Sequence, residues 1–179
     1  MAGIWVWMRR SALAALAGLT AACEEATIHD SPIRYKPNVW SFVTWARGEG
    51  PILAEVYGEA FGLGPEREHA HVLDLIRDRP AGTAITWTGD PARAGQTRYR
   101  LRILLNGPKN ATGKGLCAGQ WTSAGPQDNN AVEMLITFCD ERAPMIEIAG
   151  RVGRLDGIDD PDFASLIRTG LRLIIRPNS

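Results

Sequence analysis

The chain has few histidines, no excess of either charge, and no apolar run long enough to span a bilayer. Among its 179 residues, the basic residues number 20, the acidic residues 20 and the histidines 3. A balanced charge excludes the strongly basic surface of nucleic-acid-binding domains, so we expect no nucleic-acid partner. None of the histidines stands in a recognisable catalytic triad context, and no serine lies in a nucleophile elbow. We therefore expect that the protein is not an enzyme.

The N-terminal 22 residues have the form of a bacterial signal peptide. An apolar run, Ser11–Ala22, follows a pair of arginines and ends at Cys23. This run is shorter than the roughly 20 residues that a membrane-spanning helix needs. A positive start, a short apolar stretch and small residues before a cysteine are typical of a signal peptide that ends at a lipid-modified cysteine. We predict lipidation of Cys23, with translation starting at Met8; the alternatives are cleavage with release, and an uncleaved anchor.

The rest of the chain divides into a tether and one domain. The segment after Cys23 contains Ser31, Pro32 and Pro37 and little apolar periodicity, which is typical of a flexible linker. We therefore predict a signal peptide over 1–22, a tether over 23–38 and a single domain over 39–179, a length that supports one core. Such a protein is anchored to the inner or the outer membrane and faces the periplasm.

Two cysteines remain after lipidation of the first. In an oxidising compartment, Cys117 and Cys139 most simply form a disulfide. They lack the CxxC spacing of a redox-active pair, and no second ligand pair accompanies them for zinc. The disulfide would close a loop of about 22 residues, and loop-closure entropy makes that worth about 3 kcal/mol.

Periodicity predicts an α+β domain. Five segments alternate apolar and polar residues as strands do: 52–57, 83–88, 98–105, 131–139 and 145–152. Residues 39–46 fit either a sixth strand or a short helix. Helical spacing covers residues 65–79 and a C-terminal stretch that starts at Asp160 as N-cap. Because the apolar strand residues share one face, we expect a two-layer sandwich in which a mainly antiparallel sheet of five or six strands carries two helices on one face.

A row of arginines is the candidate binding surface. Arg98, Arg100 and Arg102 alternate along one predicted strand and therefore share its polar face. Arginine binds carboxylate and phosphate groups well, so this face suits an envelope protein or an anionic envelope component. The alternative is that the arginines form cross-strand ion pairs with Glu133 and Glu147.

Three other motifs suggest ligands but fit structural roles better. Segment Gly107–Gly115 is glycine-rich, yet it lacks the spacing and the hydroxyl residue of a P-loop, so we predict a strand-connecting loop. His69 and His71 point in divergent directions on a helix and do not share an ion without other partners. The aspartates of Asp156–Asp162 lack the spacing of a calcium loop. We therefore expect neither a metal nor a cofactor.

Two segments, PILAEVYGEAFG (51–62) and GDPARAGQTRYRLRILLNGPKNATGKGLCAG (89–119), resemble a family of short alphaproteobacterial envelope lipoproteins of uncharacterised function. The residues that stand at the family positions are Glu55, Val56, Gly58, Phe61, Gly62, Tyr99, Arg100, Asn106, Pro108, Cys117 and Cys139. The chain departs from the family pattern at Thr20, where leucine is usual in the lipobox. The resemblance implies an envelope address and a similar architecture for most of the mature domain, and it implies no activity.

These observations favour a non-catalytic interaction or assembly module of the bacterial cell envelope, working through the polar sheet face around Arg100. One alternative is a periplasmic small-ligand binding protein with a pocket between helix and sheet near Trp87 and Trp121. A further alternative is a hydrolase with an unrecognised site. A flat charged face favours the module, a deep apolar pocket the ligand-binding protein, and a cleft with a strongly perturbed titratable residue the hydrolase.

Membrane anchoring is testable at its attachment residue. We expect Cys23→Ser to release the protein from membranes, because buried acyl chains supply the membrane affinity. Cell fractionation with immunodetection measures the outcome. Unchanged membrane association of the variant would contradict lipidation.

Overall fold

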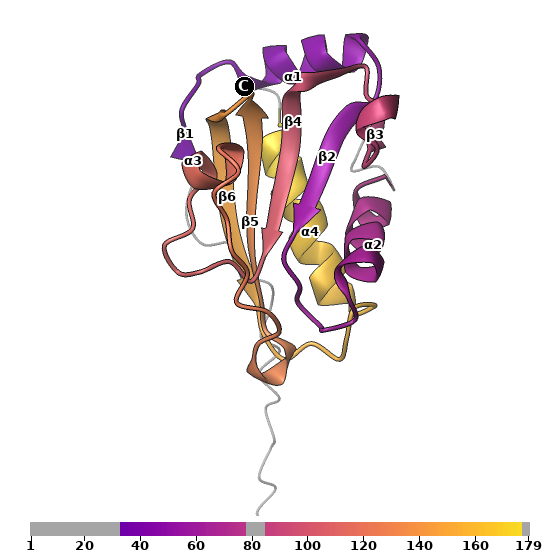
Figure 1. Cartoon of the computed structure of the whole chain (residues 1–179), viewed down its shortest axis with the longest axis vertical. Coiled ribbons are helices and arrows are strands. Elements are labelled where there is room, and N and C mark those ends of the chain that lie inside the picture. Colours follow the sequence, from indigo (N-terminus) through magenta and orange to yellow (C-terminus); the bar gives the residue numbers. More distant parts are fainter. Residues whose placement is uncertain (1–32, 78–84, 177–179) are drawn as a thin grey trace, which may run out of the picture.

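The computed structural model describes residues 33–77 and 85–176 (Figure 1). These residues form the predicted α+β fold, a six-stranded mixed sheet with helices packed on it. The elements in chain order are β1 (Ile33–Arg34), α1 (Val39–Gly48), β2 (Ile52–Tyr57), α2 (Pro65–Arg77), β3 (Trp87–Thr88), β4 (Gln96–Leu105), α3 (Gly113–Cys117), β5 (Val132–Asp140), β6 (Ala143–Val152) and α4 (Pro161–Ile174). No helix in the two described ranges is long and apolar enough to cross a membrane. The predicted signal peptide, Cys23 and most of the tether lie outside these ranges.

The sheet has the order β1-β6-β5-β4-β2-β3. Strands β4, β5 and β6 follow one another as antiparallel neighbours, and β1 adds an antiparallel edge to β6. Strand β2 runs parallel to both β3 and β4. Parallel pairing of β2 with β3 follows from α2, because a helix between two strands returns the chain to the end at which the first strand began. The sheet is therefore mainly antiparallel, as predicted, with a parallel part around β2.

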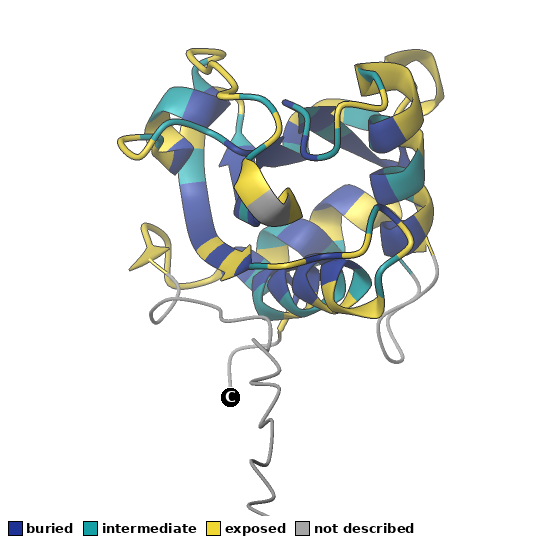
Figure 2. Cartoon of the chain, turned by 90° about the horizontal axis from the view of Figure 1, so that it is seen from below, coloured by how far each residue is buried: buried dark blue, intermediate teal, exposed yellow. Residues whose placement is uncertain are grey.

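Helices α2 and α4 cover one face of the sheet, as predicted (Figure 1). Alternate residues of β4, β5 and β6 point into this core, and most positions of these strands are buried (Figure 2). Helix α4 begins at its predicted cap, where the Asp160 carboxylate accepts a hydrogen bond from the Asp162 N–H. At Gly170, a Cβ atom would lie 2.5 Å from Cε of Met134, so the glycine lets α4 approach β5 closely.

Residues 39–48 form a helix rather than a strand. In α1, Val39, Val43 and Ala46 are buried, and their spacing of four and three residues places them on one helical face. That face packs into the main core, so α1 closes one end of the sheet (Figure 1). The apolar residues of this segment fit both the strand period and the helical period, so the sequence pattern alone does not distinguish a strand from a helix here.

Two sheet edges differ from the prediction. Strand β3 contains only Trp87 and Thr88 of the predicted 83–88 segment. Residues 85 and 86 are not in a strand, and residues 83 and 84 lie outside the described ranges. The predicted tether ends earlier than residue 38, because Ile33 and Arg34 pair with β6. The main chain of Tyr35 also donates a hydrogen bond to the carbonyl of Met145.

The second face of the sheet carries α3, which the sequence did not predict. This short helix begins at Gly113, inside the segment 107–115 that was predicted as a loop, and ends at Cys117. It packs on β4, β5 and β6. The predicted disulfide is confirmed: Cys117 at the end of α3 is bonded to Cys139 of β5. Leu116 of α3 packs with Leu104 of β4 and Leu135 of β5 in a small apolar cluster. The second face is therefore only partly polar.

Loss of the disulfide should destabilise the domain. We expect the double variant Cys117→Ala/Cys139→Ala to lose about 3 kcal/mol of the free energy of unfolding, because the unfolded chain regains the entropy of an open loop. Urea denaturation measures this change, and chemical reduction of the wild type is the matched comparison. Thiol labelling of the denatured, unreduced protein should fail at both cysteines. A loss below about 1 kcal/mol, or labelling of either cysteine, would refute the structural role.

Candidate functional site

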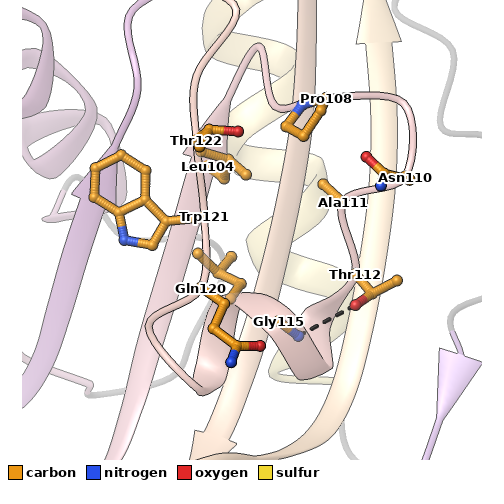
Figure 3. A pocket seen from close by; sticks show the side chains of 10 residues that line it. Leu104, Pro108, Asn110, Ala111, Thr112, Gly115, Gln120, Trp121 and Thr122 are labelled. Carbon is orange, nitrogen blue, oxygen red and sulfur yellow. Dashed lines mark hydrogen bonds between the residues drawn. The ribbon is translucent and has the colours of Figure 1, made fainter.

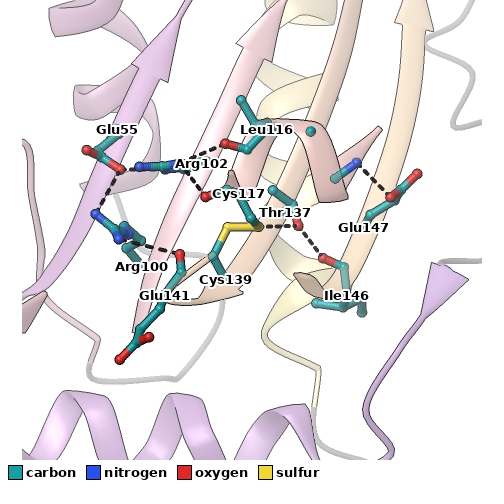
Figure 4. Close-up of a disulfide and its surroundings, with 12 residues drawn as sticks. Glu55, Arg100, Arg102, Leu116, Cys117, Thr137, Cys139, Glu141, Ile146 and Glu147 are labelled. Atoms are coloured by element: carbon teal, nitrogen blue, oxygen red, sulfur yellow. Dashed lines mark hydrogen bonds and ion pairs between the residues drawn. A yellow bond between two sulfur atoms is a disulfide. The ribbon is translucent and has the colours of Figure 1, made fainter. Parts of the chain in front are cut away.

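The three arginines of the predicted binding surface differ in burial along β4. Arg98 is exposed, Arg100 is partly buried and Arg102 is buried. At the Arg102 end, α3 covers the sheet and accepts hydrogen bonds from Arg102 (Figure 4). The arginines therefore share a sheet face, as predicted, but they are not equally available to a partner.

Arg102 holds α3 against the sheet. Its Nε donates to Oε2 of Glu55 at 2.7 Å. Its Nη1 donates to the carbonyl oxygens of Leu116 and Cys117 at 2.7 and 2.8 Å (Figure 4). These carbonyls lie at the C-terminal end of α3, where helix carbonyls lack helical partners and attract a cation. Arg102 is thus a structural residue rather than part of an exposed binding surface.

Glu147 holds the other end of α3. The Gly113 N–H donates to Oε2 of Glu147 at 2.8 Å, and the Tyr35 hydroxyl donates to the same oxygen at 2.8 Å. Burial and this hydrogen bond raise the pKa of Tyr35 above its ordinary value. The predicted pairing of the arginines with Glu147 is wrong, because Arg102 pairs with its neighbour Glu55 on β2. No ion pair joins the three arginines to Glu133 among the described residues either.

Arg98 and Arg100 lie at the open end of the face. Arg98 donates from Nε to Oδ1 of Asp140 at 2.7 Å, and this hydrogen bond raises the pKa of the guanidinium. Arg100 is held less firmly: its Nη1 lies 3.9 Å from Oε2 of Glu55, and its Nη2 donates to the Glu141 carbonyl at 3.4 Å. Its Nε has no hydrogen-bond partner among the described residues. This Nε is buried, so its N–H is not open to a partner, and the Arg100 side chain as a whole is 21% exposed.

An aromatic cluster borders Arg98. Trp45 of α1 is 51% exposed, and its ring packs edge-on against Tyr99 with centroids 5.4 Å apart. Phe42 also packs on the Tyr99 ring, with centroids 5.5 Å apart. The Arg98 guanidinium lies 5.1 Å from the centroid of the Tyr99 ring. We call Phe42, Trp45, Arg98 and Arg100 the α1–β4 patch. Sequence reasoning missed Trp45 because it left this segment undecided between strand and helix.

The two tryptophans of the predicted ligand pocket lie on opposite faces of the sheet. Trp87 is buried in the main core, in register with Ile52. Trp121 is 39% exposed and packs on Tyr57, whose side chain points to the second face. The predicted shared pocket is therefore wrong. Burial, reinforced by the charge of Glu55, raises the pKa of Tyr57 to about 12, so its hydroxyl stays protonated at neutral pH.

The two histidines of α2 both make contacts within the domain. Glu68 is buried and accepts hydrogen bonds from main-chain N–H groups within residues 60–63. His69 hydrogen-bonds through Nε2 to the carbonyl of Gly58 at 2.9 Å. His71 is partly buried and lies over the ring of Phe163 rather than in open solvent. Within residues 33–77 and 85–176, no group of three His, Cys, Asp or Glu side chains is placed to hold a metal ion.

The buried and exposed arginines should differ in their effect on stability. We expect Arg102→Ala to lower the free energy of unfolding by about 3 kcal/mol, because it removes the charged donor of the buried Cys117 carbonyl and of Glu55 and one of the donors to the Leu116 carbonyl. The matched control, Arg98→Ala, should leave stability nearly unchanged, because its ion pair is exposed to solvent. Urea denaturation of both variants measures the difference. Equal losses would contradict the assignment of Arg102 as the residue that holds α3.

Comparison with known proteins gives one distant structural similarity. No protein-family model matches the chain, and no curated protein matches it in sequence. Among solved structures, it is similar to a dodecamer of a PelC variant from Paraburkholderia phytofirmans, with 16% sequence identity and a TM-score of 0.43. The similarity covers 83% of this chain and 97% of the PelC chain. A likeness of this extent assigns neither a function nor an assembly to this chain.

Proposed function

We propose that the chain is a non-catalytic interaction module of the bacterial cell envelope, anchored through Cys23, which docks a protein partner on the α1–β4 patch. The observation that carries the proposal is the large exposed ring of Trp45 beside Arg98 on a rigid base. Tryptophan, tyrosine and arginine dominate the energetically important centres of protein interfaces.

The base of the patch is fixed by the core. Tyr99 is 6% exposed and stacks on Phe138 of β5 with centroids 6.3 Å apart. Trp45 and Phe42 both pack on Tyr99, so the exposed indole is attached to a side chain that cannot move freely. Binding then requires less ordering of interface side chains than a flexible surface would need.

The charges of the patch suit a partner with a carboxylate. Arg98 is engaged by Asp140 at 2.7 Å, whereas the partly exposed Arg100 makes only two longer contacts, at 3.9 and 3.4 Å. Guanidinium groups bind carboxylates through paired hydrogen bonds. We therefore propose that the partner presents an acidic residue next to an apolar side chain. Arginine remains protonated at neutral pH and cannot act as a base, which fits binding rather than catalysis.

Site-specific crosslinking in native cells tests this proposal. A photoreactive phenylalanine analogue replaces Trp45 in one variant and Leu63 in the other; Leu63 is also a large exposed apolar residue, at 41%. We expect a protease-sensitive crosslinked product at position 45 and not at 63, because only the first lies in the patch. Products of equal yield at both positions, or a product resistant to protease, would contradict docking of a protein there.

The arginine contribution has a matched control on α2. Arg77 forms an exposed ion pair with Asp74 at 2.9 Å, similar to that of Arg98 with Asp140 at 2.7 Å. We expect Arg98→Ala/Arg100→Ala to reduce the crosslinked product at position 45 by about tenfold or more, because charged hydrogen bonds at interfaces each contribute about 1.5–3 kcal/mol. Arg77→Ala should leave the yield unchanged. Loss of the product in both variants would point to a fold defect rather than an interface.

A further inference from the structure

A second surface feature lies apart from the α1–β4 patch, beside α3. It is a pocket of about 310 Å³ on the second face of the sheet, bordered by the segment 108–112, α3 and residues 120–122 (Figure 3). None of the residues that line it is charged. An uncharged pocket of this size lies at the lower end of the range for small-ligand sites, about 300–1,000 Å³.

The bottom of the pocket is apolar. Leu104 and Leu116 line it, and both are buried in the small cluster that they form with Leu135. Ala111 packs against the same cluster. A ligand that reached this bottom would therefore need an apolar face of its own.

One side of the pocket is an indole held in place by a stack. Trp121 packs on Tyr57 with ring centroids 4.5 Å apart, and the Arg102 guanidinium lies 5.7 Å from the Tyr57 centroid. Arg102 is itself fixed by three hydrogen bonds. Trp121 nevertheless remains 39% exposed, so part of its ring is open to a ligand. The chain thus presents a rigid aromatic surface at the pocket edge.

The remaining lining side chains are neutral hydrogen-bonding groups. The side chains of Asn110, Gln120 and Thr122 are exposed and make no hydrogen bond among the described residues. Thr112 accepts from the Gly115 N–H but keeps its hydroxyl hydrogen for another acceptor. Figure 3 shows Trp121 at one side of the pocket and Asn110 and Thr112 at the opposite side. A ligand in the pocket would meet several groups that both donate and accept, with Trp121 at the pocket edge.

We propose that this pocket binds a neutral saccharide. A sugar ring has an apolar C–H face that packs on an indole and hydroxyl groups that both donate and accept, as amide and hydroxyl side chains do. A charged ligand would lose hydration here without gaining a countercharge from the lining. The pocket volume suits one or two sugar rings. This site is independent of the α1–β4 patch and of lipidation at Cys23, so it stands or falls separately from the proposed function.

Nuclear magnetic resonance titration of the ¹⁵N-labelled protein tests the proposal. The probes are the neutral trisaccharides chitotriose and cellotriose, the cationic trimer of glucosamine, the anionic trimer of galacturonate, and adenosine. We expect a neutral trisaccharide to shift the indole N–H resonance of Trp121 with a saturating dependence on concentration below about 10 mM. The charged trimers and adenosine should bind at least several-fold more weakly. The Trp121→Phe spectrum identifies the resonance.

Two conservative variants test the contacts without threatening the fold. Gln120→Ala and Thr122→Val each change an exposed side chain that makes no hydrogen bond within residues 33–77 and 85–176, and each should weaken saccharide binding about 3- to 10-fold. Trp121→Ala should abolish the saturable shifts, whereas Trp45→Ala should leave binding unchanged. The proposal is overturned if no neutral trisaccharide binds. It is also overturned if a charged trimer or adenosine binds as tightly, or if Gln120→Ala and Thr122→Val both bind as the wild type does.

Discussion

The second face of the sheet depends on the buried guanidinium of Arg102. A helix of five residues is too short to be stable alone, so α3 exists because other groups hold it. The Cys117 disulfide fixes one point, Glu147 accepts from the first turn, and Arg102 donates to two carbonyls of the last turn. The charge of Arg102 is tolerated in the interior because Glu55 and those carbonyls replace its water. Without Arg102, the segment that covers the sheet would have unpaired polar groups at its centre.

Glu55 links the two candidate surfaces of the molecule. Its Oε2 accepts from Arg102 at 2.7 Å and lies 3.9 Å from the outward-facing Arg100. Arg102 in turn lies over Tyr57, which supports Trp121 at the pocket. One network of charge and ring contacts therefore supports the α1–β4 patch on one side and the neutral pocket on the other. This arrangement separates the charged, aromatic α1–β4 patch from the uncharged pocket.

The sequence predicted the elements that follow from regular spacing of buried residues. It did not predict the roles of residues that depend on contacts with segments distant in the sequence. Four of the five alternating strands, the cap of α4 at Asp160 and the disulfide were correct, because periodicity, capping and cysteine count can be read from the sequence. The burial of Arg102 was missed, because a polar position on a strand looks the same whether or not another segment covers it. Asn106 was noted only as a family position, yet it is fully buried, has a positive φ of 47° and accepts from the Glu133 N–H. It turns the chain from β4 into the segment that reaches α3, and no local pattern reveals such a role.

Hydrogen exchange of individual amides most directly tests whether Arg102 holds α3. In the wild type, the Leu116 and Ala118 N–H groups donate to the carbonyls of Thr112 and Lys114, so they should be protected from exchange. Arg102→Ala should increase exchange of these amides at least tenfold relative to amides in the centre of β5, because α3 opens without unfolding the main core. Unprotected α3 amides in the wild type, or equal protection in both proteins, would contradict this account.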